Sequence, residues 1–275
     1  MLHLRLRGAL TALLLSITGA AAFDDAKYPD WKGEWSREGS LAWDPTKPRG
    51  IGQQAPLTAE YQAILEASVA DQKRGGQGNY TGNQCLPYGM PGAMFPYRPM
   101  EFIITPTVAY IMLEHLTGRR WIYTDGRDWP KKSTPTLNGY SIGRWLDEDG
   151  DGRYDTLLIE TRGMRGPRSF DSTGLPLHSD NETIIKERIT LDKADPEHVL
   201  HNEITTIDHA LTRPWTVTRS YRRDRKPLWF EHLCEINNNV EIGSESYFIG
   251  ADGTLMPTRR DQPPPQLRGF DRPRQ

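Results

Sequence analysis

Nine short β-rich runs, separated by turns, dominate the chain between residues 100 and 236. They cover residues 100–105, 107–116, 119–124, 140–146, 155–162, 183–191, 199–207, 215–222 and 228–236. Thr-Gly, Asp-Gly and Asp-Pro pairs mark the turns, and no helix long enough for a parallel crossover lies between the runs. We therefore predict an all-β fold in which an antiparallel meander closes into a lipocalin-like up-and-down barrel, since closure removes exposed sheet edges. A β-sandwich is the alternative.

The segments that flank the β region differ from it in composition. Residues 23–99 are predicted to form an N-terminal arm, one short helix and a covering loop, and residues 100–258 the barrel domain. The helix is expected to follow Thr58, whose hydroxyl is a good N-cap, and to end at Gly75. Residues 259–275 contain three consecutive prolines and few apolar residues, so we predict a disordered or extended tail.

The first 22 residues have the order of a secretory signal peptide. Arg5 and Arg7 precede a short apolar run at residues 9–17, and three alanines follow at residues 20–22. The alternative is an uncleaved membrane anchor, but the apolar run is too short to span a bilayer as a helix. We predict a periplasmic or secreted protein with no stable membrane insertion once the signal is removed.

The overall composition excludes several classes of function. The chain of 275 residues has 34 basic and 36 acidic side chains, and no dense basic block indicates a nucleic-acid partner. It lacks a P-loop, a Gly-x-Ser-x-Gly elbow, a strand-linked Gly-x-Gly-x-x-Gly and a His-Glu-x-x-His motif, so we predict no organic cofactor. The seven histidines are scattered, which argues against a zinc site. The 26 aromatic residues, namely 8 Trp, 11 Tyr and 7 Phe, supply ligand-lining surface.

The chain has two cysteines, Cys85 and Cys234. In an oxidising compartment they are expected to form one disulfide that closes a loop of about 150 residues. A nucleophilic cysteine is the alternative, but nothing in the sequence around Cys85 would lower the pKa of a thiol.

An acidic loop, residues 147–155, has the spacing of a calcium-binding turn. Asp147, Asp149, Asp151 and Asp155 occupy positions 1, 3, 5 and 9 of this loop, and a glycine occupies position 6, so that the aspartate oxygens can surround a cation. Leu158 replaces the glutamate that completes an EF-hand. We predict a structural Ca²⁺ site, with a solvated acidic turn as the alternative.

Alternate residues of a strand face the same side, so a charged residue in an apolar row is expected to point into the barrel. This rule places Glu187, Arg219, His232 and Arg144 inside. The predicted catalytic residues are Glu187, His232 and the loop residue His178. A satisfied Glu187–Arg219 pair and a structural His232 are the alternatives.

The predicted ligand-binding residues combine guanidinium groups with aromatic rings. They are Arg144, Arg213, Arg219, Tyr140, Trp215 and Tyr221. Arginines beside aromatic rings suit an acidic or phenolic ligand.

Several motifs occur in a fixed order between residues 80 and 240. They include Asn-Gly-Tyr-Ser-Ile-Gly-Arg-Trp at residues 138–145, His-Ser-Asp at 178–180, Lys-Glu-Arg at 186–188 and Thr-Arg-Pro-Trp-Thr at 212–216. With these motifs the chain resembles a large family of exported proteins of environmental bacteria. The resemblance implies an all-β fold and marks Glu187, Arg144, His178 and Arg213 as motif positions. It implies no particular reaction.

Three functions fit these observations. The first is an exported barrel that binds a small aromatic or apolar molecule in its cavity. The second is a cofactor-free lyase or isomerase that acts on an aromatic or phenolic compound, in which Glu187 or His178 moves a proton and an arginine stabilises the negative charge. The third is a calcium-stabilised structural protein of the cell envelope. The sequence leaves open whether the protein is an enzyme.

Overall fold

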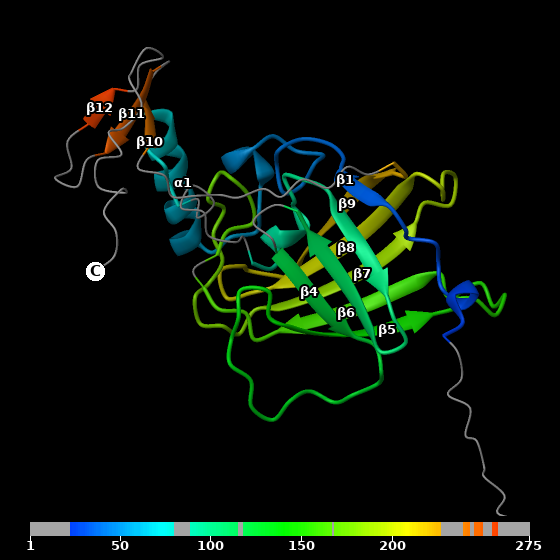
Figure 1. Ribbon diagram of the computed structural model, residues 1–275. Coiled ribbons are helices and arrows are strands. Elements are labelled where there is room, and N and C mark those ends of the chain that lie inside the picture. The colour runs from blue at the N-terminus through cyan, green and yellow to red at the C-terminus, as the bar shows by residue number, and fades with distance from the viewer. Residues whose placement is uncertain are drawn as a thin grey trace, which may run out of the picture.

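A closed barrel of nine strands forms the body of the protein (Figure 1). The computed structural model describes residues 23–79, 89–114, 118–166, 168–226, 239–242, 245–249 and 255–257. The barrel strands are β1 (Glu34–Arg37), β2 (Met100–Ile104), β3 (Val108–Leu113), β4 (Gly118–Tyr123), β5 (Tyr140–Leu146), β6 (Thr156–Arg162), β7 (Ile184–Leu191), β8 (Val199–Ile207) and β9 (Trp215–Asp224). The predicted closed barrel is confirmed.

Eight of the nine strand pairs are antiparallel, and the β4–β5 pair is parallel. The expectation of an entirely antiparallel meander is wrong at this pair. Strand directions cannot alternate all the way around a ring with an odd number of strands, so one pair must be parallel. We call residues 124–139, which connect β4 to β5, the crossover. The crossover allows the parallel pair because it returns the chain to the end of the barrel where β4 began (Figure 1).

The strand that closes the barrel is β1, which pairs with both β2 and β9. The sequence placed this segment in the N-terminal arm and expected the ninth strand at residues 228–236, which lie outside the described residues. With only four residues, β1 is too short for an alternating pattern to identify it. Trp35 of β1 is nevertheless fully buried and packs inside the barrel.

The only α-helix of the described chain, α1 (Ala59–Lys73), confirms the predicted helix. The Thr58 hydroxyl accepts a hydrogen bond from the Tyr61 N–H at 3.4 Å, and Gly75 has a φ of 89° just beyond the last turn. The buried Ser68 hydroxyl donates to the Thr173 carbonyl at 2.9 Å and so ties the helix to the β6–β7 connection. In the part of the chain that the structure describes, no helix combines the length and apolar character needed to cross a membrane.

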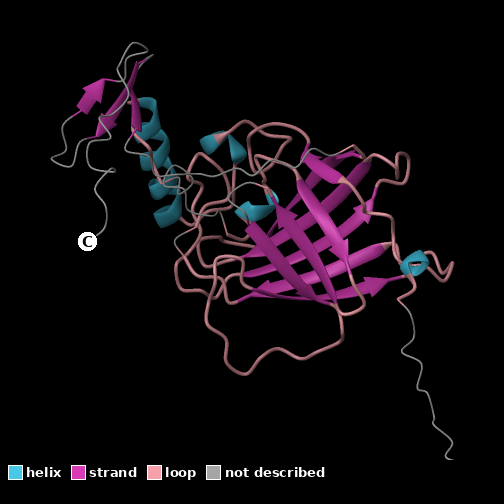
Figure 2. Cartoon of the chain, viewed as in Figure 1, coloured by secondary structure: helices cyan, strands magenta, loops and turns pink. Residues whose placement is uncertain are grey.

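We call the end of the barrel beside the α-helix, where many loops gather, the helix end (Figure 2). The β6–β7 connection, residues 163–183, and the β8–β9 connection, residues 208–214, lie at this end. Residues 89–96, which include the short 3₁₀-helix η4 (Gly92–Met94), are all buried at this end. At the opposite end, Trp31 packs against Phe102 and Trp145 with ring centroids 5.0 and 5.1 Å apart. Side chains therefore fill much of the interior from both ends.

The described C-terminal strands do not join the barrel. They are β10 (Asn239–Ile242), β11 (Glu245–Ile249) and β12 (Leu255–Pro257), which form a separate three-stranded sheet. The sequence assigned these residues to the barrel domain. The predicted signal peptide, the tail, His232 and the Cys85–Cys234 disulfide lie outside the described residues and stay predictions.

Candidate functional site

A buried ion pair occupies the barrel interior. Glu187 on β7 is 3% exposed, which confirms its predicted inward orientation. Its partner is Arg120 on β4, whose two terminal nitrogens donate to Oε1 at 3.1 Å and to Oε2 at 2.6 Å. Asn202 Nδ2 also donates to Oε1 at 2.9 Å. Both carboxylate oxygens of Glu187 thus accept hydrogen bonds from other side chains, which is typical of a buried ion pair with a structural role in the core.

In the alternative of a satisfied ion pair, the sequence pointed to Arg219 as the partner of Glu187, and Arg120 was missed. Arg120 and Ile122 face inward on β4, whereas Arg119 and Trp121 face outward. The alternation rule would have found Arg120 if it had been applied to this strand.

Arg219, Trp215 and Tyr221 point into the barrel, as the alternation on β9 predicted. One Arg219 nitrogen donates to the carbonyls of Ala42 and Trp43 at 2.7 and 2.6 Å, and burial lowers the pKa of this guanidinium. The Tyr221 hydroxyl donates to a main-chain carbonyl of η4 at 2.6 Å. In this structure these polar groups hold the loops of the helix end in place.

The predicted inward orientation of Arg144 is wrong. Arg144 is exposed on the outer face of β5, and Ser141, Gly143 and Trp145 face inward. A Cβ on Gly143 would lie 2.6 Å from the side chain of Ile122 on β4, so the interior accepts only a very small residue there. Ile142 and Leu146 therefore face outward with Arg144, against the usual pattern. Arg213 is likewise exposed, on the β8–β9 connection.

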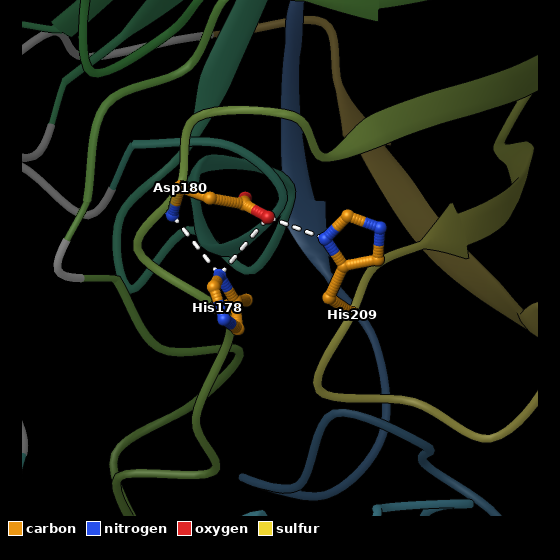
Figure 3. Close-up of side chains that lie close together, drawn as sticks. All are labelled: His178, Asp180 and His209. Atoms are coloured by element: carbon orange, nitrogen blue, oxygen red, sulfur yellow. Dashed lines mark hydrogen bonds and ion pairs between the residues drawn. The ribbon is translucent and has the colours of Figure 1, made fainter.

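His178 lies at the helix end, where it forms a cluster with Asp180 and His209 (Figure 3). His178 Nδ1 accepts a hydrogen bond from the Asp180 N–H at 3.1 Å and lies 3.1 Å from Asp180 Oδ2. The same Oδ2 is bonded to His209 Nδ1. The sequence identified His178 but not its partners, because His209 comes from a different loop. The His-x-Asp spacing was the available signal for Asp180.

The charges of this cluster shift its pKa values. The hydrogen bond that His209 donates to the Asp180 carboxylate raises the pKa of His209. Burial raises the pKa of Asp180, but the Glu182 N–H and the two histidines lower it by more, so the carboxyl titrates below its usual range. Asp180 is therefore ionised at neutral pH.

The acidic loop brings three of its four predicted ligands together. Asp147, Asp149 and Asp151 each place a carboxylate oxygen within 4.8 Å of the others, a grouping that could hold a metal ion. Asp155 Oδ2 instead accepts the main-chain N–H groups of Glu148 and Asp149 at 2.9 and 3.3 Å. Backbone N–H groups also satisfy Asp147 within the loop.

A cleft of about 580 Å³ lies between β4, the crossover and the start of β5. Tyr123 and Tyr140 stack in this region with ring centroids 4.9 Å apart, and Trp121 is 43% exposed. The lining residues are Arg119, Arg120, Trp121, Tyr123, Thr134, Pro135, Thr136, Leu137, Asn138, Gly139, Tyr140, Ser141 and Arg165. We call this the Arg–aromatic cleft.

The Arg–aromatic cleft is positively charged. Three arginines line it, and none of its described lining residues is acidic. Arg120 is neutralised by Glu187, but Arg119 and Arg165 have no ion-pair partner within the described part of the chain. The Arg119 guanidinium lies 5.0 Å from the centre of the Trp121 ring. Two guanidinium groups are therefore available to an anion beside aromatic surface.

The fold places the chain among closed, mostly antiparallel β-barrel proteins. Comparison of the sequence with known protein families and with curated proteins finds no match. Because one fold can host many functions, the function has to be argued from the geometry of these sites.

Proposed function

We propose that this protein binds a small aromatic molecule with an acidic group in the Arg–aromatic cleft. The observation that carries the proposal is a cleft lined by three arginines and three aromatic residues, with no acidic residue among its described lining. Its volume of about 580 Å³ falls in the usual range for small-molecule sites, roughly 300–1,000 Å³.

Each part of such a ligand would have a counterpart in the cleft. The exposed ring of Trp121 offers apolar surface to an aromatic ring. The stacked rings of Tyr123 and Tyr140 border the cleft mainly with their edges, because Arg127 lies over the Tyr123 ring at 3.8 Å from its centre. Arg119 and Arg165 offer planar donors to a carboxylate or a phenolate. Selectivity for acidic over neutral aromatics would follow from these two unpaired charges.

This proposal moves the binding site out of the barrel interior. The buried Arg120–Glu187 pair and the side chains packed from both ends occupy much of the interior. Of the predicted ligand-binding residues, Tyr140 lines the Arg–aromatic cleft. Arg144 lines a separate groove of about 470 Å³ on the outer face of β5–β8, where acidic and basic residues balance.

A fluorescence titration with 2-naphthoate tests the proposal, with the neutral 2-naphthalenemethanol as the comparison ligand. We expect 2-naphthoate to bind more tightly, and Arg165→Gln and Tyr140→Ala each to weaken its binding by at least about tenfold. Arg144→Gln is the matched control. It also removes an exposed arginine, but one that lines the separate groove on the outer face of β5–β8. Equal affinity for the two ligands, or equal losses in R165Q and R144Q, would contradict the proposal.

The lyase or isomerase alternative requires a base that can reach a ligand. Glu187 is 3% exposed and bonded through both oxygens, so its surroundings support a structural role. His178, the other predicted base, is not among the residues that line the Arg–aromatic cleft. Binding is the function that the geometry supports better.

Calcium binding by the acidic loop is a second, structural part of the proposal. It is supported by the grouping of Asp147, Asp149 and Asp151, and the signal-peptide pattern supports a periplasmic or secreted location, where calcium reaches millimolar concentration. We expect calorimetry to detect one weak Ca²⁺ site that Asp147→Asn removes. Absence of heat at millimolar Ca²⁺ would leave the loop as a solvated turn.

A further inference from the structure

We infer that His178, Asp180 and His209 form a binding site for a divalent transition-metal ion, with Zn²⁺ as the simplest probe. The site is separate from both the Arg–aromatic cleft and the acidic loop. We did not predict this site from the sequence, because the seven histidines are scattered along the chain. The fold brings His178 and His209 together from the β6–β7 and β8–β9 connections.

The three side chains already have nearly the spacing of a metal site. One ligand atom from each lies within 4.8 Å of the other two, and Asp180 Oδ2 points between the imidazole rings (Figure 3). Ligand atoms about 2.0–2.1 Å from a tetrahedral ion lie about 3.3 Å from one another. The separation of His178 Nδ1 and Asp180 Oδ2 is 3.1 Å, so a side-chain movement that releases Nδ1 from the Asp180 N–H would complete the coordination.

The backbone on both sides of the cluster is fixed by a single buried carboxylate, that of Asp208. Its Oδ1 accepts the N–H groups of His178 and Ala210 at 2.9 and 2.8 Å, and its Oδ2 accepts the Thr183 hydroxyl at 2.5 Å. His209 lies between Asp208 and Ala210, so the two loops that carry the histidines are held together. Support of this kind around the ligands favours metal binding, because little order has to be created.

The surroundings of the cluster attract a cation. Asp180 and Asp208 act electrostatically on both His209 and Tyr61. Glu182 acts on His209, and Glu60 acts on Tyr61. Arg168 is a nearby buried cation, and it donates to Thr183 and to the His178 carbonyl. Negative charge therefore exceeds positive charge around the three ligands.

The donor set indicates which ions would bind. Two imidazoles and one carboxylate suit Zn²⁺ and Fe²⁺, whereas Ca²⁺ requires six to eight oxygen ligands. Three protein ligands leave a fourth position for water or for a bound molecule. The His209 side chain is 64% exposed, so that position would be open to solvent.

The competing explanation is that Asp180 simply forms ordinary hydrogen bonds with two histidines. The chain provides matched controls in two other His–Asp pairs, His198–Asp195 and His201–Asp192, each with a nitrogen–oxygen distance of 2.7 Å. Each has one histidine and one carboxylate, so neither provides the two imidazoles and one carboxylate of the proposed site.

Zn²⁺ titration of the metal-free full chain by calorimetry, with Co²⁺ absorption as a second readout, tests the inference. We expect one Zn²⁺ per chain and a visible Co²⁺ spectrum typical of low coordination number. His178→Ala and His209→Ala should each weaken Zn²⁺ binding by at least about tenfold, and His201→Ala should leave it unchanged. The cleft variant Y140A should also bind Zn²⁺ normally, which separates this inference from the proposed function.

The inference fails if the wild-type chain binds no Zn²⁺, if H209A binds it as tightly as the wild type, or if H201A loses as much affinity as H209A. Asp180→Asn is a second variant that keeps the size of the side chain. Loss of Zn²⁺ binding in D180N with an unchanged circular dichroism spectrum would support the site even if an alanine variant were to misfold. Normal binding in D180N and H178A would overturn it.

Discussion

Replacing Arg120 by methionine should strongly destabilise the protein. The substitution keeps much of the apolar stem of Arg120 but removes the two hydrogen bonds of 3.1 and 2.6 Å to Glu187, together with the bonds to Met94 Sδ and Thr161. It leaves the Glu187 carboxylate buried, with Asn202 as its remaining hydrogen-bond donor. Loss of one partner from a buried ion pair costs about 3–5 kcal/mol, and we expect R120M to lose that much free energy of unfolding.

Urea unfolding at pH 7.5, followed by tryptophan fluorescence, measures this loss. The double variant R120M/E187M removes both charges and leaves Asn202 without its acceptor, so it should cost only about 1–3 kcal/mol. Arg188→Met is a control from the adjacent position on β7, where Arg188 forms an exposed ion pair with Glu148, and it should shift the midpoint far less. The reasoning is refuted if R120M resembles R188M, or if the double variant is less stable than R120M.

Two further perturbations test the strand assignments. Burial and the neighbouring carboxylates raise the pKa of Glu34. The folded state therefore binds a proton on Glu34 more readily than the unfolded state does. As the pH rises above about 4.5 this proton is lost, and the free energy of unfolding decreases. Glu34→Gln should therefore raise the urea midpoint at pH 7.5, and the gain should shrink toward pH 4; a constant gain would show that charge is not its cause. Gly143→Ala should cost about 1–3 kcal/mol, because its Cβ would lie 2.6 Å from the Ile122 side chain, and an unchanged midpoint would show that β5 faces the other way.

The sequence predicted most of the barrel because its strands are long enough to show their pattern. The runs at residues 183–191 and 215–222 alternate over four or more positions, and they correspond to β7 and β9 with the expected inward residues. The alternation failed on β5, where Ser141 and Gly143 face the crowded interior. It could not detect β1, which has four residues and depends on its partners β2 and β9 for its place in the sheet.

The candidate sites were harder to predict because they depend on contacts between distant segments. His178 stood out in its loop, but its grouping with His209 requires the two connections of the helix end to meet. The Arg–aromatic cleft depends on the parallel β4–β5 pair and on the path of the crossover, neither of which has a local signal. Tyr140 was identified as a ligand-binding residue, whereas Arg119 and Arg165 were not.

Mapping of 2-naphthoate binding by amide chemical-shift changes in the ¹⁵N-labelled protein tests the proposed function most directly. If the ligand occupies the Arg–aromatic cleft, the shifts should concentrate on residues 119–123, 134–141 and 165, and they should saturate with a single dissociation constant. Shifts centred on the outer groove at residues 142–144 and 186–188, or on residues of the barrel interior, would contradict the proposed binding site. An absence of shifts at saturating ligand would contradict the proposed function.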